Sequence, residues 1–209
     1  MHKIRCLNAK GGCGKTSLAT NLATWYADDG RKVALADYDP QKSALDWLAA
    51  RADYEGVPTI EGVDGTADKA RAAPGTDLLV TDAPAGTHGP ELTALLRRTD
   101  TLLVPVLPSP IDMRAVARFL EELISSGRVS RGQTRIALVE NRVRENSRLF
   151  HVLDDFLQRY EVPVLTHLRE SVNYLRSAET GLGIFELAPS AVAQDVVLWD
   201  PVFEWIDQG

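Results

Sequence analysis

The segment from Asn8 to Ser17, with the sequence NAKGGCGKTS, most constrains what this chain can fold into. It follows a short apolar run and precedes an amphipathic stretch, so it lies where a first strand leads into a first helix. Its glycines let successive backbone N–H groups point into one concavity, and the N-terminus of the following helix adds partial positive charge. The segment therefore predicts a phosphate-binding loop.

Several side chains of this loop are candidates for contacts with ATP and Mg²⁺. We expect Lys15 to reach the β- and γ-phosphates and the Thr16 hydroxyl to be a ligand of Mg²⁺. The residues that we expect to bind the nucleotide are Lys10, Gly11, Gly12, Cys13, Gly14, Lys15, Thr16 and Ser17. The alternative is a glycine-rich turn in which a lysine and a threonine follow glycine by chance.

Hydrophobic patterning predicts an α/β fold with a doubly wound, mostly parallel sheet flanked by helices, because short apolar runs alternate with amphipathic stretches. The apolar stripe Leu18, Leu22 and Tyr26 predicts a helix over Lys15–Asp28, and a second helix is expected around Val116–Leu123. The unit Pro58–Ala73 has no clear period. The expected strands are Lys3–Asn8, Lys32–Asp37, Asp77–Asp82, Thr101–Leu107, Arg135–Glu140 and Val164–His167.

Length and composition indicate one P-loop domain over residues 1–209, since 44% hydrophobic residues can supply one sizeable core. No run approaches the roughly twenty apolar residues of a membrane span, and the start of the chain has no secretory pattern, so we expect a cytoplasmic protein. Cys6 and Cys13 are the only cysteines, too few for a disulfide framework, and we interpret them as small packed hydrophobic residues.

Charge is unevenly distributed along the chain. The net charge of −6 argues against a surface that binds nucleic acid everywhere, but six arginines lie between Arg128 and Arg148 against only Glu140 and Glu145. The segment from Ser177 onward contains six acids and no Lys or Arg, so an anionic membrane surface would repel it. We expect its hydrophobic residues to pack on the body of the protein, with contact to a partner as the alternative.

Two acidic stretches end predicted strands, and the carboxyl ends of parallel strands are where α/β proteins place ligand contacts. Asp37–Ser43 has the sequence DYDPQKS, and Asp77–Gly86 has the sequence DLLVTDAPAG. The second has the form of a Walker B strand and switch II, so we expect Asp82 to hold Mg²⁺ through water and Gly86 to offer a backbone N–H near the γ-phosphate. Helix capping and turn formation are the alternative roles.

The loop departs from the pattern GxxxxGK(S/T), because Ala9 stands at the first glycine position and Lys10 enters the loop. KGGCGKTS instead resembles the deviant Walker A motif of the ParA/MinD superfamily. The resemblance implies that Lys10 is the signature lysine, which reaches across a nucleotide-sandwich homodimer to the partner's phosphates. A second ammonium there would stabilise charge on the γ-phosphate during transfer.

Further roles follow from the same resemblance. DYDPQ resembles the family's switch I, which implies that Asp39 orients the attacking water and that Asp37 supports it. The catalytic candidates are then Lys10, Lys15 and Asp39, and the metal candidates are Thr16, Asp39 and Asp82. Pro108 and Asn141 lie where the family contacts adenine, although an asparagine at a strand end is often only a turn residue.

The chain looks most like the small ParA-type partition ATPases typified by ParF. This implies slow, partner-stimulated ATP hydrolysis, an ATP-dependent homodimer, non-specific binding to nucleoid DNA, and a small cargo adaptor of the ParB type. The cargo would be a plasmid or a large assembly such as a carboxysome. The candidate DNA contacts are Arg142, Arg144, Arg148, Arg169 and Arg176.

Two other classes of function remain open. One is a metabolic or redox P-loop enzyme, such as a ligase resembling dethiobiotin synthetase or a reductase resembling the nitrogenase iron protein. The other is an ATP-switched interaction module that does not bind DNA. Lys10 together with DYDPQ favours the positioning ATPases over the metabolic enzymes.

Overall fold

Parallel strands form one seven-stranded sheet in the order β3-β2-β4-β1-β5-β6-β7 in the computed structural model, which describes residues 1–68 and 70–208. The strand order reverses beside β1, and α/β proteins place ligand crevices at such a switch point. The predicted doubly wound parallel sheet is confirmed. The strands are β1 (His2–Cys6), β2 (Val33–Asp37), β3 (Glu61–Asp64), β4 (Leu78–Asp82), β5 (Thr101–Val106), β6 (Arg135–Val143) and β7 (Val164–Arg169).

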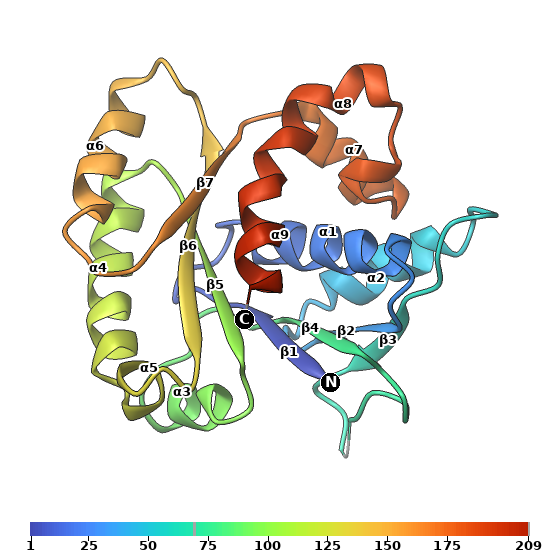
Figure 1. Ribbon diagram of the computed structural model, residues 1–209, viewed down its shortest axis with the longest axis horizontal. Coiled ribbons are helices and arrows are strands. Elements are labelled where there is room, and N and C mark those ends of the chain that lie inside the picture. The colour runs from blue at the N-terminus through green and yellow to red at the C-terminus, as the bar shows by residue number, and fades with distance from the viewer. Residues whose placement is uncertain (69, 209) are drawn as a thin grey trace.

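Helices cover both faces of the sheet (Figure 1). One buried cluster packs α1, α2 and the C-terminal helices on one face, and a second packs α3, α4 and α6 on the other. The helices are α1 (Lys15–Asp28), α2 (Ser43–Arg51), α3 (Gly89–Leu96), α4 (Pro110–Ser125), α5 (Gly127–Ser130), α6 (Arg148–Leu157), α7 (Val172–Thr180), α8 (Pro189–Val196) and α9 (Asp200–Asp207), with 3₁₀ turns η1 (Ile184–Glu186) and η2 (Val197–Trp199).

The elements with strong patterns form where they were predicted. Helix α1 has the predicted bounds, and its stripe of Leu18, Leu22 and Tyr26 is buried. The buried stripe of α4 likewise includes Val116 and Leu123. The six predicted strands also form, with shifted ends. Because helices cover both faces, the inner strands β2, β4 and β5 are largely apolar, which made them recognisable in the sequence.

Two features of the sheet were not predicted. Strand β3 lies at the edge within the unit Pro58–Ala73, of which Lys69 is outside the described residues. Only Val63 of β3 is buried, so it has too little apolar pattern to be recognised. Strand β6 continues beyond Glu140 through a register shift against β7, and Arg142 there has a positive φ of 53°. A bulge of this kind redirects side chains, here those of Asn141 and Arg142.

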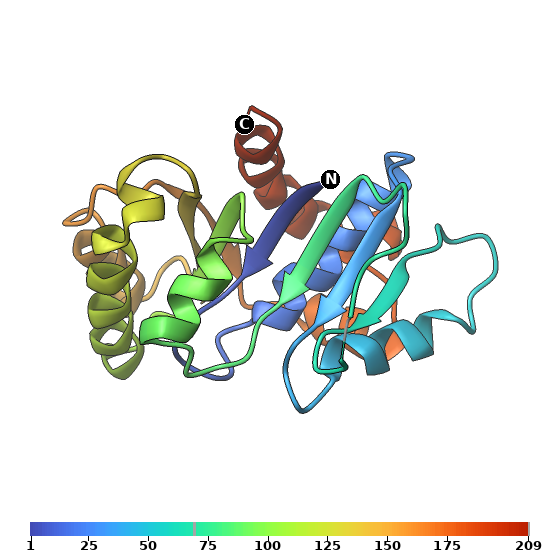
Figure 2. The ribbon, with the colours of Figure 1, turned by 90° about the horizontal axis from the view of Figure 1, so that it is seen from below.

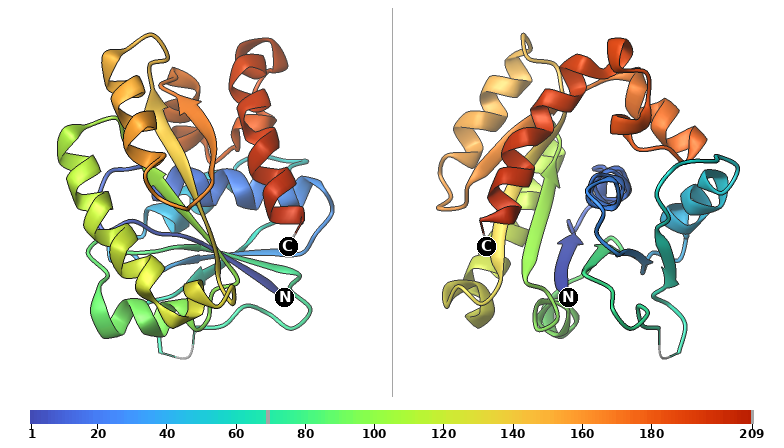
Figure 3. Two further views of the ribbon diagram at one scale, coloured as in Figure 1. Left: turned by 60° about the vertical axis from the view of Figure 1, so that its left-hand side comes forward. Right: turned by 45° about the vertical axis from the view of Figure 1, so that its right-hand side comes forward.

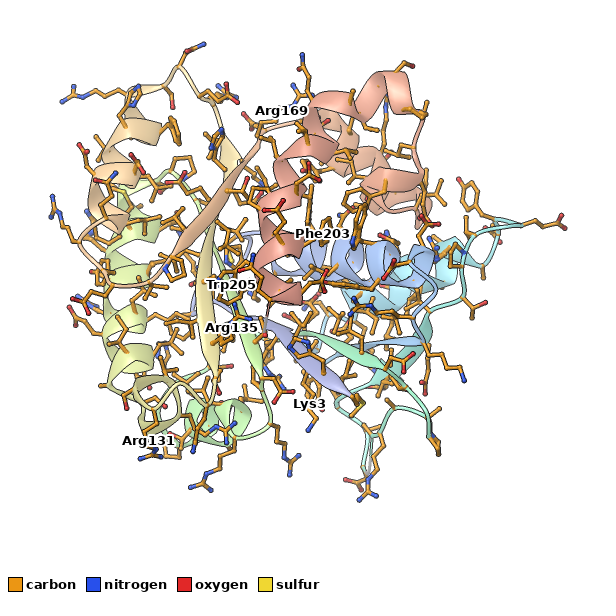
Figure 4. The ribbon with its side chains drawn as sticks, viewed as in Figure 1. Lys3, Arg131, Arg135, Arg169, Phe203 and Trp205 are labelled. Carbon is orange, nitrogen blue, oxygen red and sulfur yellow. The ribbon has the colours of Figure 1, made fainter. Side chains whose placement is uncertain are left out.

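The acidic C-terminal segment packs on the body of the protein, as predicted (Figure 3). Phe203 of α9 stacks on Trp25 of α1 with ring centroids 4.2 Å apart. Arg135 of β6 lies over the ring of Trp205, 4.1 Å from its centroid, and donates to the Trp205 carbonyl (Figure 4). Among the described helices, none is long and apolar enough to cross a membrane.

Phe203→Ala tests how much this packing stabilises the fold. The ring is 4% exposed, and loss of a buried phenylalanine costs about 3–5 kcal/mol of the free energy of unfolding. Val197→Ala is the matched control in the same segment, because its side chain is 57% exposed and its loss should change stability by less than about 0.5 kcal/mol. Urea unfolding measures both variants, and equal losses would contradict the packing.

Candidate functional site

The loop between β1 and α1 curls around a concavity. Gly12 and Gly14 have φ values of 75° and 97°, in the left-handed region that favours glycine. Gly14 has a second requirement, since a Cβ there would lie 2.0 Å from the Asn141 side-chain nitrogen. That nitrogen donates to the Cys13 carbonyl at 2.8 Å. Asn141, in the bulge of β6, thus fixes the backbone of the phosphate loop.

The first turn of α1 leaves its backbone donors available. Gly14 is the N-cap residue, so no side chain caps the helix, and no residue of the first turn is acidic. Lys15 is 6% exposed, and its Nζ donates to the Lys10 carbonyl at 3.1 Å. Uncapped amides, the helix dipole and an ammonium group together favour a bound polyphosphate.

Thr16 and Asp82 meet at the carboxyl end of the sheet. The Thr16 hydroxyl donates to Asp82 Oδ2 at 2.6 Å, while Asp82 Oδ1 is buried without a hydrogen-bond partner among the described residues. Burial raises the pKa of Asp82 to about 7; Asp37 and Asp39 raise it further, and the Thr16 hydrogen bond and Lys15 oppose the shift. An orphaned carboxylate oxygen beside a hydroxyl fits a divalent cation.

The donor chemistry narrows the kind of metal. No cluster of three or more His, Cys, Asp or Glu side chains suited to a metal occurs in the described part of the chain. Mg²⁺ keeps several waters and takes one or two protein ligands beside phosphate oxygens, so the pair Thr16 and Asp82 suits it. Asp39, the third metal candidate, lies close enough to Asp82 to raise its pKa.

The acidic loop after β2 is fixed by its own first residue. Asp37 is fully buried, and its Oδ2 accepts the N–H groups of Ala44 and Leu45 at the start of α2. Its Oδ1 accepts the Asp39 N–H at 2.9 Å. Asp39 lines the cavity beside the phosphate loop. The acidic stretch therefore has both of the roles considered from the sequence: Asp37 caps a helix, and Asp39 lies at the cavity.

A cavity of about 440 Å³ lies between the loop, α2 and α7. Seven of the residues predicted to contact nucleotide or metal line it, together with Arg142, which was predicted as a DNA contact: Gly11, Gly12, Gly14, Lys15, Thr16, Ser17 and Asp39. Cys13 does not, because its side chain is buried beneath the loop. No local pattern marks the wall formed by Trp47, Tyr174 and Ser177, which only the tertiary fold brings to the loop.

A second cavity, of about 370 Å³, shares Ser17, Arg142 and Tyr174 with the first. Asn141 and the apolar side chains of Val172 and Leu175 also line it, so it can accept a flat heteroaromatic base beside an amide group. Pro108, the other candidate for an adenine contact, is not among the residues that line either cavity.

Lys10 is directed away from the first cavity. Its Nζ forms an ion pair with Asp112 of α4 at 2.9 Å, and Asp112 is 4% exposed. The two lysines of the loop therefore differ: Lys15 serves the cavity of its own chain, and Lys10 is held on a buried carboxylate outside it. Asp112 was not predicted, since nothing in the motif marks a contact to α4.

The five arginines proposed to contact DNA fall into two groups. Arg144 is paired with Glu170, and Arg169 with the buried carboxylate of Asp195. Figure 4 shows Arg169 at the end of the molecule opposite Lys3 and Arg131. Of these five, Arg142, Arg148 and Arg176 are exposed and form no ion pair with a described carboxylate.

Comparison with known proteins places the chain in the family that the sequence motifs resemble. A family model described as "CobQ/CobB/MinD/ParA nucleotide binding domain" matches residues 4–184. The "Maintenance of carboxysome distribution protein A" of Halothiobacillus neapolitanus is 34% identical over 186 residues, which cover 86% of this chain and 85% of that protein. The "Chromosome-partitioning ATPase Soj" of Thermus thermophilus is 38% identical over 86 residues, 38% of this chain and 34% of Soj.

Solved structures share the fold. The cell division protein MinD of Aquifex aeolicus has a TM-score of 0.76 at 18% identity, with 100% of this chain and 98% of that chain covered. The ATP complex of a Cyanothece McdA variant has a TM-score of 0.68 at 15% identity, with 97% of this chain and 96% of that chain covered. At these identities the likeness shows the arrangement of the sheet and helices.

Asp82→Asn should stabilise the protein without nucleotide or Mg²⁺ at pH 8. The pKa of Asp82 is about 7 in the folded protein against an ordinary value of 3.8, so the wild type loses stability as pH rises from about 4 to about 7. Asparagine does not titrate and keeps an acceptor for Thr16. Urea unfolding at pH 5 and pH 8 should show the advantage of the variant growing with pH; a constant difference would contradict the shifted pKa.

Proposed function

The chain belongs to the family of CobQ/CobB/MinD/ParA nucleotide-binding domains, and from this premise we propose that it is a ParA-type ATPase. It binds MgATP, forms an ATP-sandwich homodimer, and hydrolyses ATP slowly when a partner stimulates it. The dimer binds DNA non-specifically and positions a cargo on the nucleoid in the cytoplasm. One domain over residues 1–209 would carry all of these steps.

The observation that carries the proposal is the different placement of the two loop lysines, Lys15 and Lys10. Lys15 lines the cavity, whereas Lys10 is paired with Asp112 outside it. A lysine that the chain's own cavity does not use is available to a nucleotide bound by a second copy. Exchange of Asp112 for the partner's phosphates would link dimerisation to ATP.

Within one subunit, each group has a defined task. The loop amides and Lys15 bind the phosphates, and the ring of Tyr174 and the Asn141 amide lie where the base would fit. Thr16 and Asp82 would hold Mg²⁺, which neutralises phosphate charge when bound. Asp39 would orient the attacking water, and Lys10 of the second subunit would stabilise charge on the γ-phosphate.

Lys10→Gln tests the sandwich dimer. Glutamine keeps an N–H donor for Asp112, so the monomer should stay folded and bind nucleotide. Turnover should fall by about 100-fold or more, since a charge supplied across an interface contributes at least that much elsewhere. Sedimentation velocity should show no dimer with ATP, whereas the control Lys3→Gln, near the amino end of β1, should dimerise normally. Unchanged dimerisation and turnover of Lys10→Gln would contradict the proposal.

The cargo and the surface are supported by the relatives. The Halothiobacillus protein is named for carboxysome distribution, and Soj for chromosome partitioning. We infer that a small adaptor of the ParB type, or its equivalent on a carboxysome, stimulates hydrolysis here. Arg142, Arg148 and Arg176 are exposed and free of described ion pairs, and dimerisation would double their number along a duplex.

Charge reversal separates this DNA surface from a general effect of charge. Arg148→Glu with Arg176→Glu should weaken binding of non-specific duplex in the presence of ATP and reduce the salt dependence by about one unit per lost phosphate contact. Arg97→Glu with Arg98→Glu is the matched control, since these exposed arginines directly follow α3, close to the amino end of β5.

Retention on duplex DNA at two salt concentrations measures both double variants. If the two double variants weakened DNA binding equally, the DNA-binding surface would not be the one that contains Arg148 and Arg176. Negligible binding of the wild type with ATP, with ADP and without nucleotide would instead favour an ATP-switched interaction module.

A further inference from the structure

Arg5 in the central strand β1 is buried in an unusual way. Its side chain faces away from α1, because its neighbours Ile4 and Cys6 pack in the cluster on the α1 side. It is 5% exposed, it forms no ion pair with a described carboxylate, and Nη1 has no hydrogen-bond partner there. Burial lowers the pKa of Arg5 to about 10. A buried guanidinium without a carboxylate is costly, so its position calls for a function.

The contacts of Arg5 lead to the acidic loop. Its Nε donates to Thr99 Oγ1 at 3.0 Å, which fixes the guanidinium against the connection between α3 and β5. The guanidinium carbon lies 5.5 Å from the centroid of the Tyr38 ring, within the range of a cation–π contact. Tyr38 is the residue between Asp37 and Asp39.

Tyr38 is anchored on the face of the sheet opposite α1. There the segment around Ala70 and Ala72, rather than a helix, packs on β2 and β4, and the Tyr38 ring joins this small cluster (Figure 2). The Tyr38 N–H donates to the Asp82 carbonyl at 3.0 Å. At the end of β2, the Asp37 carboxylate therefore caps α2 on one face of the sheet, while the Tyr38 ring packs on the opposite face.

Gly65, directly after β3, contacts the Tyr38 ring from the side of that strand. Its N–H donates to the Asp37 carbonyl at 2.8 Å, and a Cβ at this position would lie 2.5 to 2.6 Å from atoms of the Tyr38 ring. The ring therefore lies directly on the glycine backbone. Since β2 lies between β3 and the pair β4 and β1, Gly65 and Arg5 hold the ring from opposite sides of its strand.

We propose that Arg5 and Gly65 are positioning residues: they clamp the Tyr38 ring and so fix the direction in which the adjacent Asp39 enters the nucleotide cavity. The inference rests on the proposed role of Asp39 in orienting water. The hydrogen bonds that Asp39 forms with described residues stay within its own loop: its N–H donates to the Asp37 carboxylate, its carboxylate accepts the Gln41 N–H, and its carbonyl accepts the Lys42 N–H. A displacement of about 1 Å at such a residue can cost about 100-fold in rate.

Kinetics distinguish positioning from binding. Gly65→Ala should displace the Tyr38 ring, and Arg5→Met should release it, so each should lower kcat by about 10- to 100-fold while KM for ATP changes by less than about twofold. Both act on one ring, so the double variant should be no slower than the slower single variant. Arg5→Lys and Tyr38→Phe, which keep a cation and a ring, should retain most of the activity.

Gly62→Ala is the matched control on β3, the strand that leads to Gly65. A Cβ there meets the flexible ends of Leu45 and Leu48, at 3.3 and 3.1 Å respectively, rather than Tyr38. This variant should keep kcat within about twofold of the wild type. Unchanged kcat in Gly65→Ala and Arg5→Met, losses that multiply in the double variant, or an equal loss in Gly62→Ala would overturn the clamp.

Hydrogen–deuterium exchange tests the clamp without relying on ATP turnover. In the protein without nucleotide, Gly65→Ala and Arg5→Met should each increase exchange in residues 38–43 relative to the wild type and Gly62→Ala. If the wild type proved to have no ATPase activity, the proposed function would fail while this measurement still decided the clamp. Exchange that is unchanged in both variants would overturn the inference.

Discussion

The register of β4 between β1 and β2 is the constraint on which the rest of the structure depends. Parallel pairing places Asp82 level with Cys6 on one side and with Asp37 on the other, so three neighbouring strands end at one edge of the sheet. A slip of one residue would turn Asp82 to the opposite face and away from Thr16. The positions of the Thr16 and Asp82 oxygens, the cap of α2 and the start of the phosphate loop all follow from the same backbone hydrogen bonds.

The parts of the fold and site that could be predicted are those encoded by neighbouring residues. The phosphate loop and α1 follow from glycine positions and a helical stripe, and Asp82 follows from a buried strand that ends in an acid. The ion pair of Lys10 with Asp112 joins residues about a hundred positions apart, and no local pattern marks it. The same holds for the contact of Arg5 with Tyr38 and for the wall that Tyr174 adds to the cavity, which depend on long-range packing.

Several charged groups around the site are buried with incomplete hydrogen bonding. Arg5 Nη1, Asp82 Oδ1 and Asp112 Oδ1 have no partners among the described residues. Such groups reduce the stability of the fold, because an unsatisfied buried charge is more costly than an apolar side chain. Two of them contact the phosphate loop, since Asp82 accepts from Thr16 and Asp112 of α4 pairs with Lys10. The other two atoms of this kind in the described residues belong to Arg135 and Glu140 of β6. Local rules of stability are commonly broken where a protein must change state.

The C-terminal segment determines when the site is complete. Ile184 donates to Asn21 of α1, Asn21 donates to Ser17 of the phosphate loop, and Tyr174 forms part of the cavity wall. Ribosomes add about 5–20 residues per second, so about 10 to 40 s separate synthesis of the phosphate loop from synthesis of α9. Until α9 is made, the Trp25 ring of α1 lacks the cover of Phe203, and until α7 is made the cavity lacks the wall that includes Tyr174 and Ala178. The phosphate loop is thus synthesised early, but its cavity is completed late. A bound nucleotide therefore cannot stabilise the nascent chain during most of its synthesis.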